Sequence, residues 1–578
     1  MSAPAPSPAR YQEVADAKAA GATYTPRRLA DFVSDQIIRA AENSLTDAQD
    51  LRLLDPAIGD GELLCSLLSR LPKRETLRIT VVGFETDPAA LARARSRLQR
   101  DYPDVRFDLR LVSFLEYVLA HTVRPTLFSG DSAEEKFDLI IANPPYVRTQ
   151  IIGAADAQQL ARTFGLTGRV DLYHAFLIGM SKALKPTGTA GVIVSNRFMT
   201  TKGAGAIRAA LRGNWCLQHI WDLGDTKLFD AAVLPAVVLA GGHATEAERV
   251  PRFSSIYATT EGGSTEVEGP LEALDESGLV TTTDGRSFDV KHGTLAVDDD
   301  LSSVWRIATD AGDDWMEAVA SKTWATFGDL GKIRVGVKTC ADKVFIRSGW
   351  SDASEENPPE LLRRLTTHHV ARRFKAASAG KWRDILYPHT SEGGVRRPVN
   401  LNDWPISRAY LEANRSTLEA RSYVIAGGRQ WFELWVPQDP ALWSRPKLVF
   451  RDISECPTFW VDLDQTVVNG DCYWLVTEKL ENEELLWLAA AVSNSTFIES
   501  FYDRRFNNKL YGGRRRFITQ YVEQFPLPDP TLDTSKDMID LAKSIYELED
   551  GQPRDALEAR LDGLVWEAFG LPIKEAPR

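Results

Sequence analysis

Apolar positions along the first half of the chain follow two alternating patterns. Helical spacing covers residues 27–41, 87–100 and 171–184, with Thr25 as the expected N-cap of the first helix and Pro26 in its first turn. Short apolar runs predict strands near residues 51–54, 79–84, 137–142, 191–195, 219–222 and 234–240. This alternation predicts an α/β fold, a doubly wound and mainly parallel sheet with helices on both faces. Ligands of such sheets bind beyond the carboxyl ends of the strands.

One strand-like run leads directly into Asn143-Pro144-Pro145-Tyr146. The Asn143 side-chain oxygen and the Pro144 carbonyl can each accept an N–H of a planar exocyclic amine. This contact would localise the lone pair that such an amine delocalises into its ring, as methyl transfer requires. Proline fixes φ and therefore holds the carbonyls stiffly, and Tyr146 offers a face on which an extruded base can stack. The alternative is an ordinary turn with two prolines.

A second motif lies upstream, at residues 51–64. A short apolar run ends at Asp55 and is followed by a turn containing Gly59 and Gly61, and a helix is expected to begin near Glu62. Glycine permits backbone conformations and close ligand approach that a Cβ would prevent. Glu85 ends the next strand, where doubly wound folds place an acceptor for ribose hydroxyls. A solvated strand end is the alternative for Glu85.

Together these segments resemble the adenine-specific DNA methyltransferases of type II restriction–modification systems. The resemblance is to the group with the cofactor motif before Asn-Pro-Pro-Tyr and target recognition at the C-terminus. The matching segments are Tyr24–Leu29, Asp55–Gly61, Gly83–Asp87, Asn143–Tyr146, Gly191–Phe198 and Phe229 with Ala232–Leu239. The resemblance implies a class I S-adenosylmethionine-dependent methyltransferase fold with a C-terminal α+β target recognition domain.

The resemblance also implies roles for individual residues. Expected catalytic residues are Asn143, Pro144, Tyr146 and Phe229, with Tyr146 and Phe229 stacking on the two faces of a flipped adenine. Residues expected to bind S-adenosyl-L-methionine are Thr25, Asp55, Ala57, Gly59, Gly61, Glu85, Ser113, Phe114 and Pro145.

One position departs from the family pattern. Ser113 stands where the family usually has an aspartate that accepts a hydrogen bond from the cofactor's adenine amine. A hydroxyl is a weaker acceptor than a carboxylate. Asp108 or Glu116 could take over this role, and Phe114 could still pack against the adenine ring.

Composition is that of a globular protein with more than one domain. The chain has 578 residues, of which 44% are hydrophobic and 26% charged, whereas single cores stop growing at roughly 250–300 residues. The five cysteines show no metal-ligand spacing, and their odd number argues against a disulfide framework. We expect free thiols, with Cys65 and Cys216 in the core, in a cytoplasmic protein without a membrane span or a metal.

The net charge of −12 does not exclude a DNA partner, because local charge distribution governs binding. Basic and aromatic residues with two glycines occupy residues 502–517. Such a segment suits phosphate contacts, although a solvated loop has the same composition. The residues expected to contact DNA are Arg504, Arg505, Lys509, Arg514, Arg515 and Arg516.

The expected domains are a flexible tail (1–20), a methyltransferase domain (21–245), a linker with short strands (246–324) and a target recognition domain (325–578). In the last, residues 431–435 and 446–452 are expected to form strands, and the tryptophans are expected in the core more often than on a base-stacking surface. His368-His369 is expected to be a polar pair without a metal.

The sequence therefore predicts an enzyme, a site-specific DNA adenine-N6 methyltransferase that flips its target base and protects host DNA. We expect it to bind double-stranded DNA as a monomer, with a restriction endonuclease encoded separately. Alternatives are an RNA or protein-amide methyltransferase, and a DNA-reading component of a phage-defence assembly with weak or no catalysis.

Overall fold

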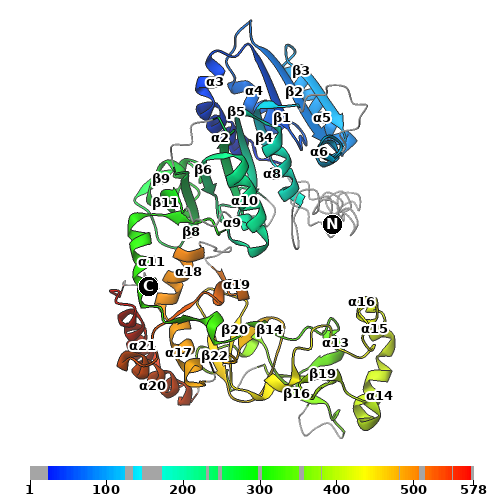
Figure 1. Cartoon of the computed structure of the whole chain (residues 1–578), viewed down its shortest axis with the longest axis vertical. Helices are drawn as coiled ribbons and strands as arrows, with labels where there is room; N and C mark the ends of the chain where they lie inside the picture. Colours follow the sequence, from blue (N-terminus) through cyan, green and yellow to red (C-terminus); the bar gives the residue numbers. More distant parts are fainter. Residues whose placement is uncertain are drawn as a thin grey trace, which may run out of the picture. The chain divides into compact units, whose positions relative to one another are not determined.

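The computed structural model comprises two compact units, Met1–Thr309 and, in the main, Asp310–Asn508 with Arg514–Arg578 (Figure 1). Each is described by itself. The structure describes residues 24–123, 135–145, 172–229, 234–244, 250–296, 303–350, 357–378, 381–480, 482–506, 514–549 and 551–573.

A mainly parallel sheet forms the centre of the first unit. Its leading strands lie in the order β3-β2-β1-β4-β5-β7-β6, and β7 alone in this series runs antiparallel to its neighbours. The strands are β1 (Asp50–Asp55), β2 (Arg78–Glu85), β3 (Arg106–Leu111), β4 (Phe137–Ala142), β5 (Leu184–Ser195), β6 (Cys216–Asp222) and β7 (Pro235–Gly241). This arrangement confirms the predicted doubly wound sheet.

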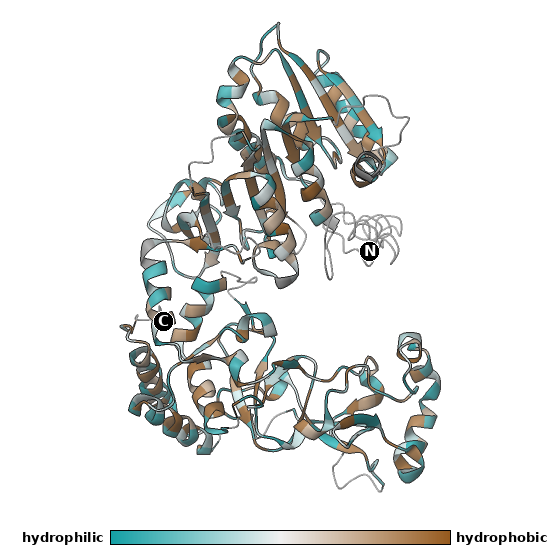
Figure 2. Cartoon of the chain, viewed as in Figure 1, coloured by the Kyte–Doolittle hydropathy of each residue, from teal (hydrophilic) through white to brown (hydrophobic). Residues whose placement is uncertain are grey.

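Helices cover both faces of this sheet, and each face has its own hydrophobic core. Successive strand residues point to opposite faces, so Leu53 joins one core and Leu54 the other. The apolar strands between the helices are visible in Figure 2. The helices are α2 (Arg27–Ala40), α3 (Glu42–Thr46), α4 (Glu62–Arg70), α5 (Pro88–Asp101), α6 (Phe114–Val123), α8 (Leu172–Ala183), α9 (Arg197–Thr200) and α10 (Gly205–Asn214), with the 3₁₀ turn η2 (Lys202–Ala204).

Helix α2 begins differently from the expectation. Pro26 is its N-cap, and the Pro26 carbonyl accepts the backbone N–H groups of Leu29 and Ala30. Thr25 makes no capping hydrogen bond. Its hydroxyl is used elsewhere, as described below.

The segment that composition assigned to a linker extends the sheet. Strands β8 (Arg252–Thr259) and β11 (Ser287–Leu295) pair antiparallel over eight positions, and β8 runs parallel to β6. The polar residues of this segment lie mainly in its turns, whereas its strand residues Phe253, Ile256 and Phe288 are buried. The sheet thus has 12 strands, and the first unit continues to Thr309 rather than ending near residue 245. The remaining elements are β9 (Thr265–Val267), η3 (Glu272–Asp275), β10 (Gly278–Thr282) and β12 (Ile307–Ala308).

The second unit is an α+β structure with two small sheets, of order β14-β24-β20-β22 and β15-β17-β16-β23. Their strands are β14 (Arg334–Val335), β15 (Ile346–Arg347), β16 (Leu362–Thr366), β17 (Arg383–Leu386), β20 (Lys447–Arg451), β22 (Phe459–Asp462), β23 (Val467–Val468) and β24 (Cys472–Leu475). Three pairs of short strands are added: β13 (Ala325–Thr326) with β26 (Pro526–Leu527), β18 (His389–Glu392) with β19 (Val395–Pro398), and β21 (Ile453–Ser454) with β25 (Arg515–Arg516).

Helices of the second unit are mostly short until its C-terminal part. They are α11 (Asp310–Lys322), α12 (Phe327–Leu330), α13 (Asp342–Phe345), α14 (Pro405–Ala413), α15 (Arg415–Glu419), α16 (Ser422–Ala426), α17 (Glu484–Ser493), α18 (Thr496–Phe506), α19 (Thr519–Val522), α20 (Asp533–Glu547) and α21 (Asp555–Ala568). The 3₁₀ turns are η4 (His368–Val370), η5 (Leu401–Asp403) and η6 (Pro440–Ser444). Within the described residues, no helix is long and apolar enough to cross a membrane.

Tryptophans fill the core of the second unit, as expected. Trp350, Trp443, Trp460, Trp474 and Trp566 are each at most 2% exposed. Large aromatic side chains contribute much apolar area, so these residues stabilise the unit rather than offering stacking surfaces.

Residues 431–435 do not form the expected strand. Backbone carbonyls of this segment are bound by a side chain instead of a neighbouring strand. The Arg421 guanidinium donates to the carbonyls of Trp431 and Glu433 at 2.7 and 3.1 Å. The other expected strand, at 446–452, is present as β20. His368 forms a hydrogen bond with Asp471, and among the residues described no cluster of His, Cys, Asp or Glu could hold a metal ion.

Candidate active site

Three strand ends meet at the carboxyl edge of the first unit's sheet. Asp55 ends β1, Glu85 ends β2, and Asn143 follows β4 by one residue. Strand β1 lies between β2 and β4 and is parallel to both. The topology therefore brings these three polar residues to one edge, where a doubly wound sheet binds ligands.

The glycine turn is held against the end of β2. Gly59 and Gly61 have φ values of 54° and 83°, in the left-handed region that glycine adopts without strain. The Gly59 N–H donates to Glu85 Oε2 at 3.0 Å, and the Ile58 N–H donates to the Phe84 carbonyl at 2.9 Å. Glu85 Oε1 accepts the backbone N–H groups of Thr86 and Asp87 at 2.7 and 2.9 Å. Glu85 thus fixes the turn, and its expected contact with ribose hydroxyls remains a prediction.

Asp55 is a buried carboxylate with one unsatisfied oxygen. Its Oδ1 accepts the Ala57 N–H at 3.0 Å, whereas Oδ2 has no hydrogen-bond partner among the described residues. Burial, with the nearby charges of Glu85 and Asp60, raises the pKa of Asp55 to about 7. An unpaired buried acceptor is costly, so Asp55 fits a site that receives an N–H donor from a ligand.

Ser113, which stands where the family usually has an aspartate, lies directly before helix α6. Ser113 Oγ accepts the Leu115 N–H at 3.3 Å and so helps to begin α6. Phe114 is 1% exposed and packs edge-on against Phe84 with ring centroids 5.4 Å apart. Its expected contact with the cofactor remains a prediction.

The two suggested replacements for that aspartate differ in position. Asp108 pairs with Val82 in the middle of β3 and forms an ion pair with Arg110, whereas Glu116 is exposed in the first turn of α6. Neither position is tested as a replacement, and both remain predictions.

Asn143 is oriented by the segment that precedes α2. Its Nδ2 donates to Thr25 Oγ1 at 3.0 Å. Next to it, Tyr24 is 50% exposed, and the Tyr24 hydroxyl accepts from Arg93 at 2.8 Å. A Cβ built on Gly59 would lie 4.0 Å from the Tyr24 ring. Residues 24 and 25 therefore connect the glycine turn with Asn143. Pro144 is buried and Pro145 half-buried, while Tyr146 lies outside the described residues.

A buried polar network, which the sequence did not predict, lies beside this edge. Asp222, at the end of β6, accepts from the Tyr257 hydroxyl at 2.7 Å, from Asn196 Nδ2 at 3.0 Å and from the Gly224 N–H at 3.2 Å. Burial raises the pKa of Asp222 to about 6 despite these bonds. Asn196 follows β5, the neighbour of β4, and belongs to a matched family segment, which was the available signal. Tyr257 lies in β8, inside the supposed linker.

Phe229 is the expected second stacking residue. It is 6% exposed and belongs to the core that also contains Trp221 and Leu223. Its contact with a flipped base therefore remains a prediction.

Two arginines of the basic segment form close ion pairs with acidic residues. Arg515 contacts Asp503 at 2.8 Å and Glu499 at 3.4 Å, and its side chain is only 11% exposed. Arg516 contacts Asp452 at 3.0 Å. Asp503 lies within the segment itself and Glu499 just before it, whereas Asp452 comes from another part of the chain, and composition alone did not reveal these pairings. Arg515 and Arg516 thereby have structural roles that the sequence did not predict.

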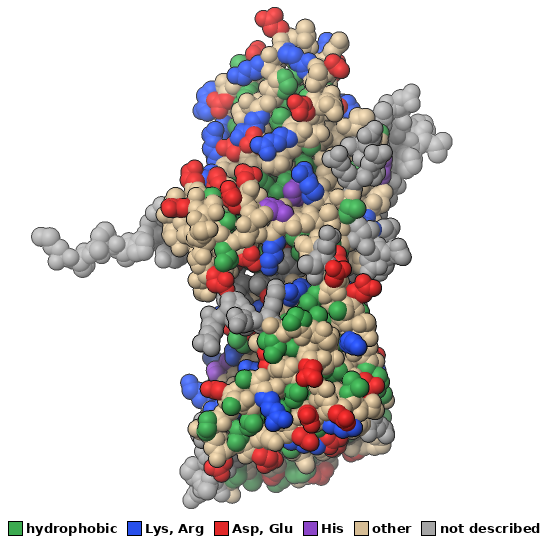
Figure 3. Space-filling model, turned by 90° about the vertical axis from the view of Figure 1, so that its left-hand side faces the viewer, with side chains coloured by type: hydrophobic (Ala, Val, Ile, Leu, Met, Phe, Trp, Pro, Cys, Tyr) green, Lys and Arg blue, Asp and Glu red, His purple; other side chains and the backbone are tan. Residues whose placement is uncertain are grey.

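The other basic positions differ in exposure. Arg504 lies 4.6 Å from the centre of the Trp315 ring, and Arg505 donates to Gln524 at 3.3 Å. Arg514 is 57% exposed and 3.8 Å from Glu455, and Lys509 lies outside the described residues. On the face drawn in Figure 3, basic and acidic side chains are intermixed rather than separated into large patches.

Two family models match the chain, one in each unit. Residues 96–229 match the Eco57I restriction-modification methylase model, and residues 399–527 match the TaqI-like C-terminal specificity domain. The solved type ISP restriction-modification enzyme LlaGI, a nuclease-deletion mutant in complex with a DNA substrate mimic, has a similar fold. Its TM-score is 0.52 at 11% identity, covering 92% of this chain and 55% of that one.

Curated relatives match over most of their length. The type II methyltransferase M.PaeR7I of Pseudomonas aeruginosa is 25% identical over 88% of this chain and 86% of its own. The type II methyltransferase M.BanIII of Aneurinibacillus aneurinilyticus is 37% identical over 96% of this chain and 97% of its own. The fold is that of the class I S-adenosylmethionine-dependent methyltransferases, for which S-adenosyl-L-methionine is the cofactor. The chain belongs to the type II DNA methyltransferases of restriction–modification systems.

Proposed function

We propose that the protein is a site-specific DNA adenine-N6 methyltransferase that modifies a base flipped out of the duplex. The observation that carries this proposal is the hydrogen bond from Asn143 Nδ2 to Thr25 Oγ1. Because Asn143 Nδ2 is directed at Thr25, the second terminal atom of the amide, Oδ1, is directed away from Thr25. A carbonyl-type oxygen in a fixed direction is what an exocyclic amine needs as an acceptor.

The residues of the carboxyl edge fit S-adenosyl-L-methionine. Glu85 would accept from the ribose hydroxyls, the turn at Gly59 and Gly61 would allow close backbone approach, and Asp55 would receive an N–H donor from the amino-acid part. When bound, the cofactor supplies a methyl group that is already activated by its positively charged sulfur. The protein's contribution is then mainly orientation.

The chemistry of the target amine assigns the remaining roles. Asn143 Oδ1 and the Pro144 carbonyl would accept its two N–H groups and localise the nitrogen lone pair. Tyr146 and Phe229 would hold the ring between them. No base of matched pKa is required before transfer, because the methylated ammonium is acidic and loses its proton afterward.

The second unit would select the DNA site, consistent with its match to a specificity domain. We further propose that the protein acts as a monomer and protects host DNA from a separately encoded endonuclease. The site itself depends on side chains that reach base edges in the groove.

Methyl transfer to three acceptors tests the proposal. The purified protein is incubated with methyl-labelled S-adenosyl-L-methionine and unmethylated duplex DNA, RNA or a glutamine-containing protein, and the labelled products are hydrolysed and identified. We expect N6-methyladenine in DNA at a defined sequence. Label in RNA or on a protein amide would replace the DNA assignment. Cofactor binding without methyl transfer to DNA, RNA or protein would overturn the proposal that the protein is a catalyst.

A further inference from the structure

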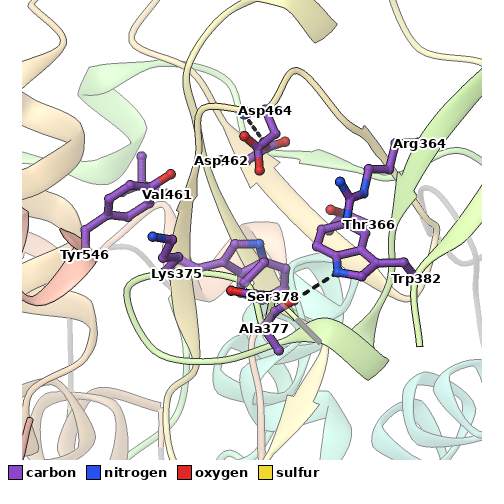
Figure 4. A pocket seen from close by; sticks show the side chains of 12 residues that line it. Arg364, Thr366, Lys375, Ala377, Ser378, Trp382, Val461, Asp462, Asp464 and Tyr546 are labelled. Atoms are coloured by element: carbon purple, nitrogen blue, oxygen red, sulfur yellow. Dashed lines mark hydrogen bonds between the residues drawn. The ribbon is translucent and has the colours of Figure 1, made fainter. Parts of the chain in front are cut away.

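A cavity of about 300 Å³ lies in the second unit (Figure 4). Its walls come from β16, β22, the loop between η4 and β17, and the end of α20. The residues that give it chemical character are Arg364, Lys375, Ser378, Trp382, Asp464 and Tyr546. Small-ligand sites usually have volumes of roughly 300–1,000 Å³, so this cavity could hold one small group.

Two cations in this cavity are positioned by aromatic rings. The Arg364 guanidinium lies 3.9 Å from the centre of the Trp382 ring, and Lys375 Nζ lies 4.7 Å from that of Tyr546. Neither cation forms an ion pair with any residue that the structure describes. A ring face orients a cation without cancelling its charge. The two side chains therefore remain available to an anion.

The loop that carries Lys375 is held under backbone strain. Phe374, just before it, has a φ of 68° and is fully buried. Its N–H donates to the Phe459 carbonyl at 2.8 Å, and its carbonyl accepts the Val461 N–H at 3.0 Å. Non-glycine residues with positive φ cost energy and concentrate at functional sites. The strain here places a lysine at the cavity wall.

The far side of the loop is also fixed. The Ala377 N–H donates to the Val370 carbonyl at 2.9 Å, and the Ala377 carbonyl accepts from Trp382 Nε1 at 2.9 Å. The same tryptophan thus anchors the loop and carries Arg364 on its face. The two cations are thus linked through the contacts of Trp382 and the loop.

The two carboxylates of the cavity are not equivalent. Asp462 is buried and forms an ion pair with the buried Lys447 at 3.0 Å, so its charge is compensated. Asp464 is exposed, and its N–H donates to Asp462 Oδ1 at 2.8 Å. The cavity therefore presents two cations and one solvent-facing carboxylate.

We propose that this cavity binds a nucleotide unit. Lys375 and Arg364 would contact phosphate oxygens, and the Asp464 carboxylate would accept from an exocyclic amine of the base, as carboxylates do from cytosine. The nucleotide could come from a strand of bound DNA or from the free nucleotide pool. Binding of a nucleotide from a DNA strand rests on the proposed function, whereas binding of a free nucleotide does not.

Calorimetry with deoxycytidine monophosphate tests the proposal on the full chain. The cofactor pocket is first saturated with S-adenosylhomocysteine, so that only other sites are measured. The double variant Arg364→Gln/Lys375→Gln keeps most of both side-chain stems. Arg363→Gln is the matched control, since Arg363 is the neighbouring residue on β16 and lies over a different ring, Tyr387, at 5.2 Å. Thermal unfolding of all variants checks the fold.

We expect the parent and Arg363→Gln to bind deoxycytidine monophosphate and the double variant to bind it at least tenfold more weakly. Asp464→Asn should weaken this nucleotide more than inorganic phosphate. Absence of binding to the parent, or equal affinity in the double variant, overturns the proposal. Binding of duplex DNA then identifies the source. A salt slope reduced by about 0.9 in the double variant, the value for one phosphate, indicates the DNA strand, and an unchanged slope indicates a free nucleotide. Asn143→Ala should leave nucleotide binding intact, which separates this site from methyl transfer.

Discussion

Asn143 Nδ2 donates a hydrogen bond of 3.0 Å to Thr25 Oγ1, across 118 residues of sequence. An amide can be rotated by half a turn with little change in shape, so its oxygen and nitrogen are distinguished only by their partners. A hydroxyl can both donate and accept. Here the Thr25 hydroxyl accepts from Asn143 Nδ2, and with the amide in this orientation Asn143 Oδ1 is the atom that would accept from a target amine. This relationship leads to the first two predictions.

Replacing Asn143 by alanine should lower the rate of methyl transfer by at least about 100-fold, the scale found when one preorganised polar partner of a reaction is removed. The cofactor affinity should be nearly unchanged, because Glu85 and the glycine turn are untouched. Single-turnover transfer to duplex DNA measures the rate, and calorimetry measures the affinity. Near-normal turnover would refute the role of Asn143.

Replacing Thr25 by valine keeps the shape of the side chain but removes the hydroxyl. We expect a rate loss of roughly 5- to 30-fold, corresponding to about 1–2 kcal/mol for one hydrogen bond. Thr25→Ser should retain most of the activity, since it restores the acceptor. Full activity in Thr25→Val together with a loss in Thr25→Ser would show that the threonine methyl group, rather than its oxygen, is what matters.

Replacing Glu85 by alanine should weaken S-adenosyl-L-methionine binding by about 1.5–3 kcal/mol, the contribution of a hydrogen bond to a charged group. It should also lower thermal stability, because the N–H groups of Gly59, Thr86 and Asp87 lose their acceptor. Glu75→Ala is the control, since Glu75 is exposed. An unchanged dissociation constant in calorimetry would place Glu85 outside the cofactor site.

Asp55 should make stability depend on pH. Its pKa of about 7 in the folded protein exceeds the usual unfolded value of about 3.9. Between these values the folded state keeps a proton that the unfolded state has lost, so this contribution to stability is full below about pH 4 and is lost as pH rises through 7. Asp55→Asn removes the effect. Its melting temperature relative to the parent should therefore rise from pH 5 to pH 8, and a constant difference would contradict the buried, protonated carboxyl.

The arginines of the basic segment should separate into two kinds. Arg515→Gln leaves Asp503 and Glu499 uncompensated and should destabilise the protein by about 3 kcal/mol, the lower end for breaking a buried ion pair. Arg514→Gln, at an exposed position, should leave the melting temperature unchanged. If Arg514 contacts a phosphate, this variant reduces the salt slope of DNA binding by about 0.9. A DNA effect of Arg515→Gln without loss of stability would reverse this division.

Local patterns in the sequence determined the core of the first unit. Alternating apolar runs and amphipathic stretches predicted β1, β2, β4, β5, β6 and β7 and the helices α2, α4, α5 and α8, because side-chain periodicity follows directly from backbone geometry. The strand-end positions of Asp55, Glu85 and Asn143 followed as well, since a parallel sheet places all carboxyl ends on one edge.

Only the tertiary structure showed which side chains and strands interact when they are far apart in the sequence. Thr25 had the sequence position of a helix cap, but its hydroxyl accepts a hydrogen bond from Asn143. Arg515, which was expected to contact DNA, also forms ion pairs with Asp503 and Glu499. Strands β8 and β11 were hidden by polar turns, because composition averages over a segment whereas sheet pairing depends on single buried faces. The pairing of Lys375 with Tyr546 joins residues 171 positions apart, and only the folded chain brings such groups within contact distance.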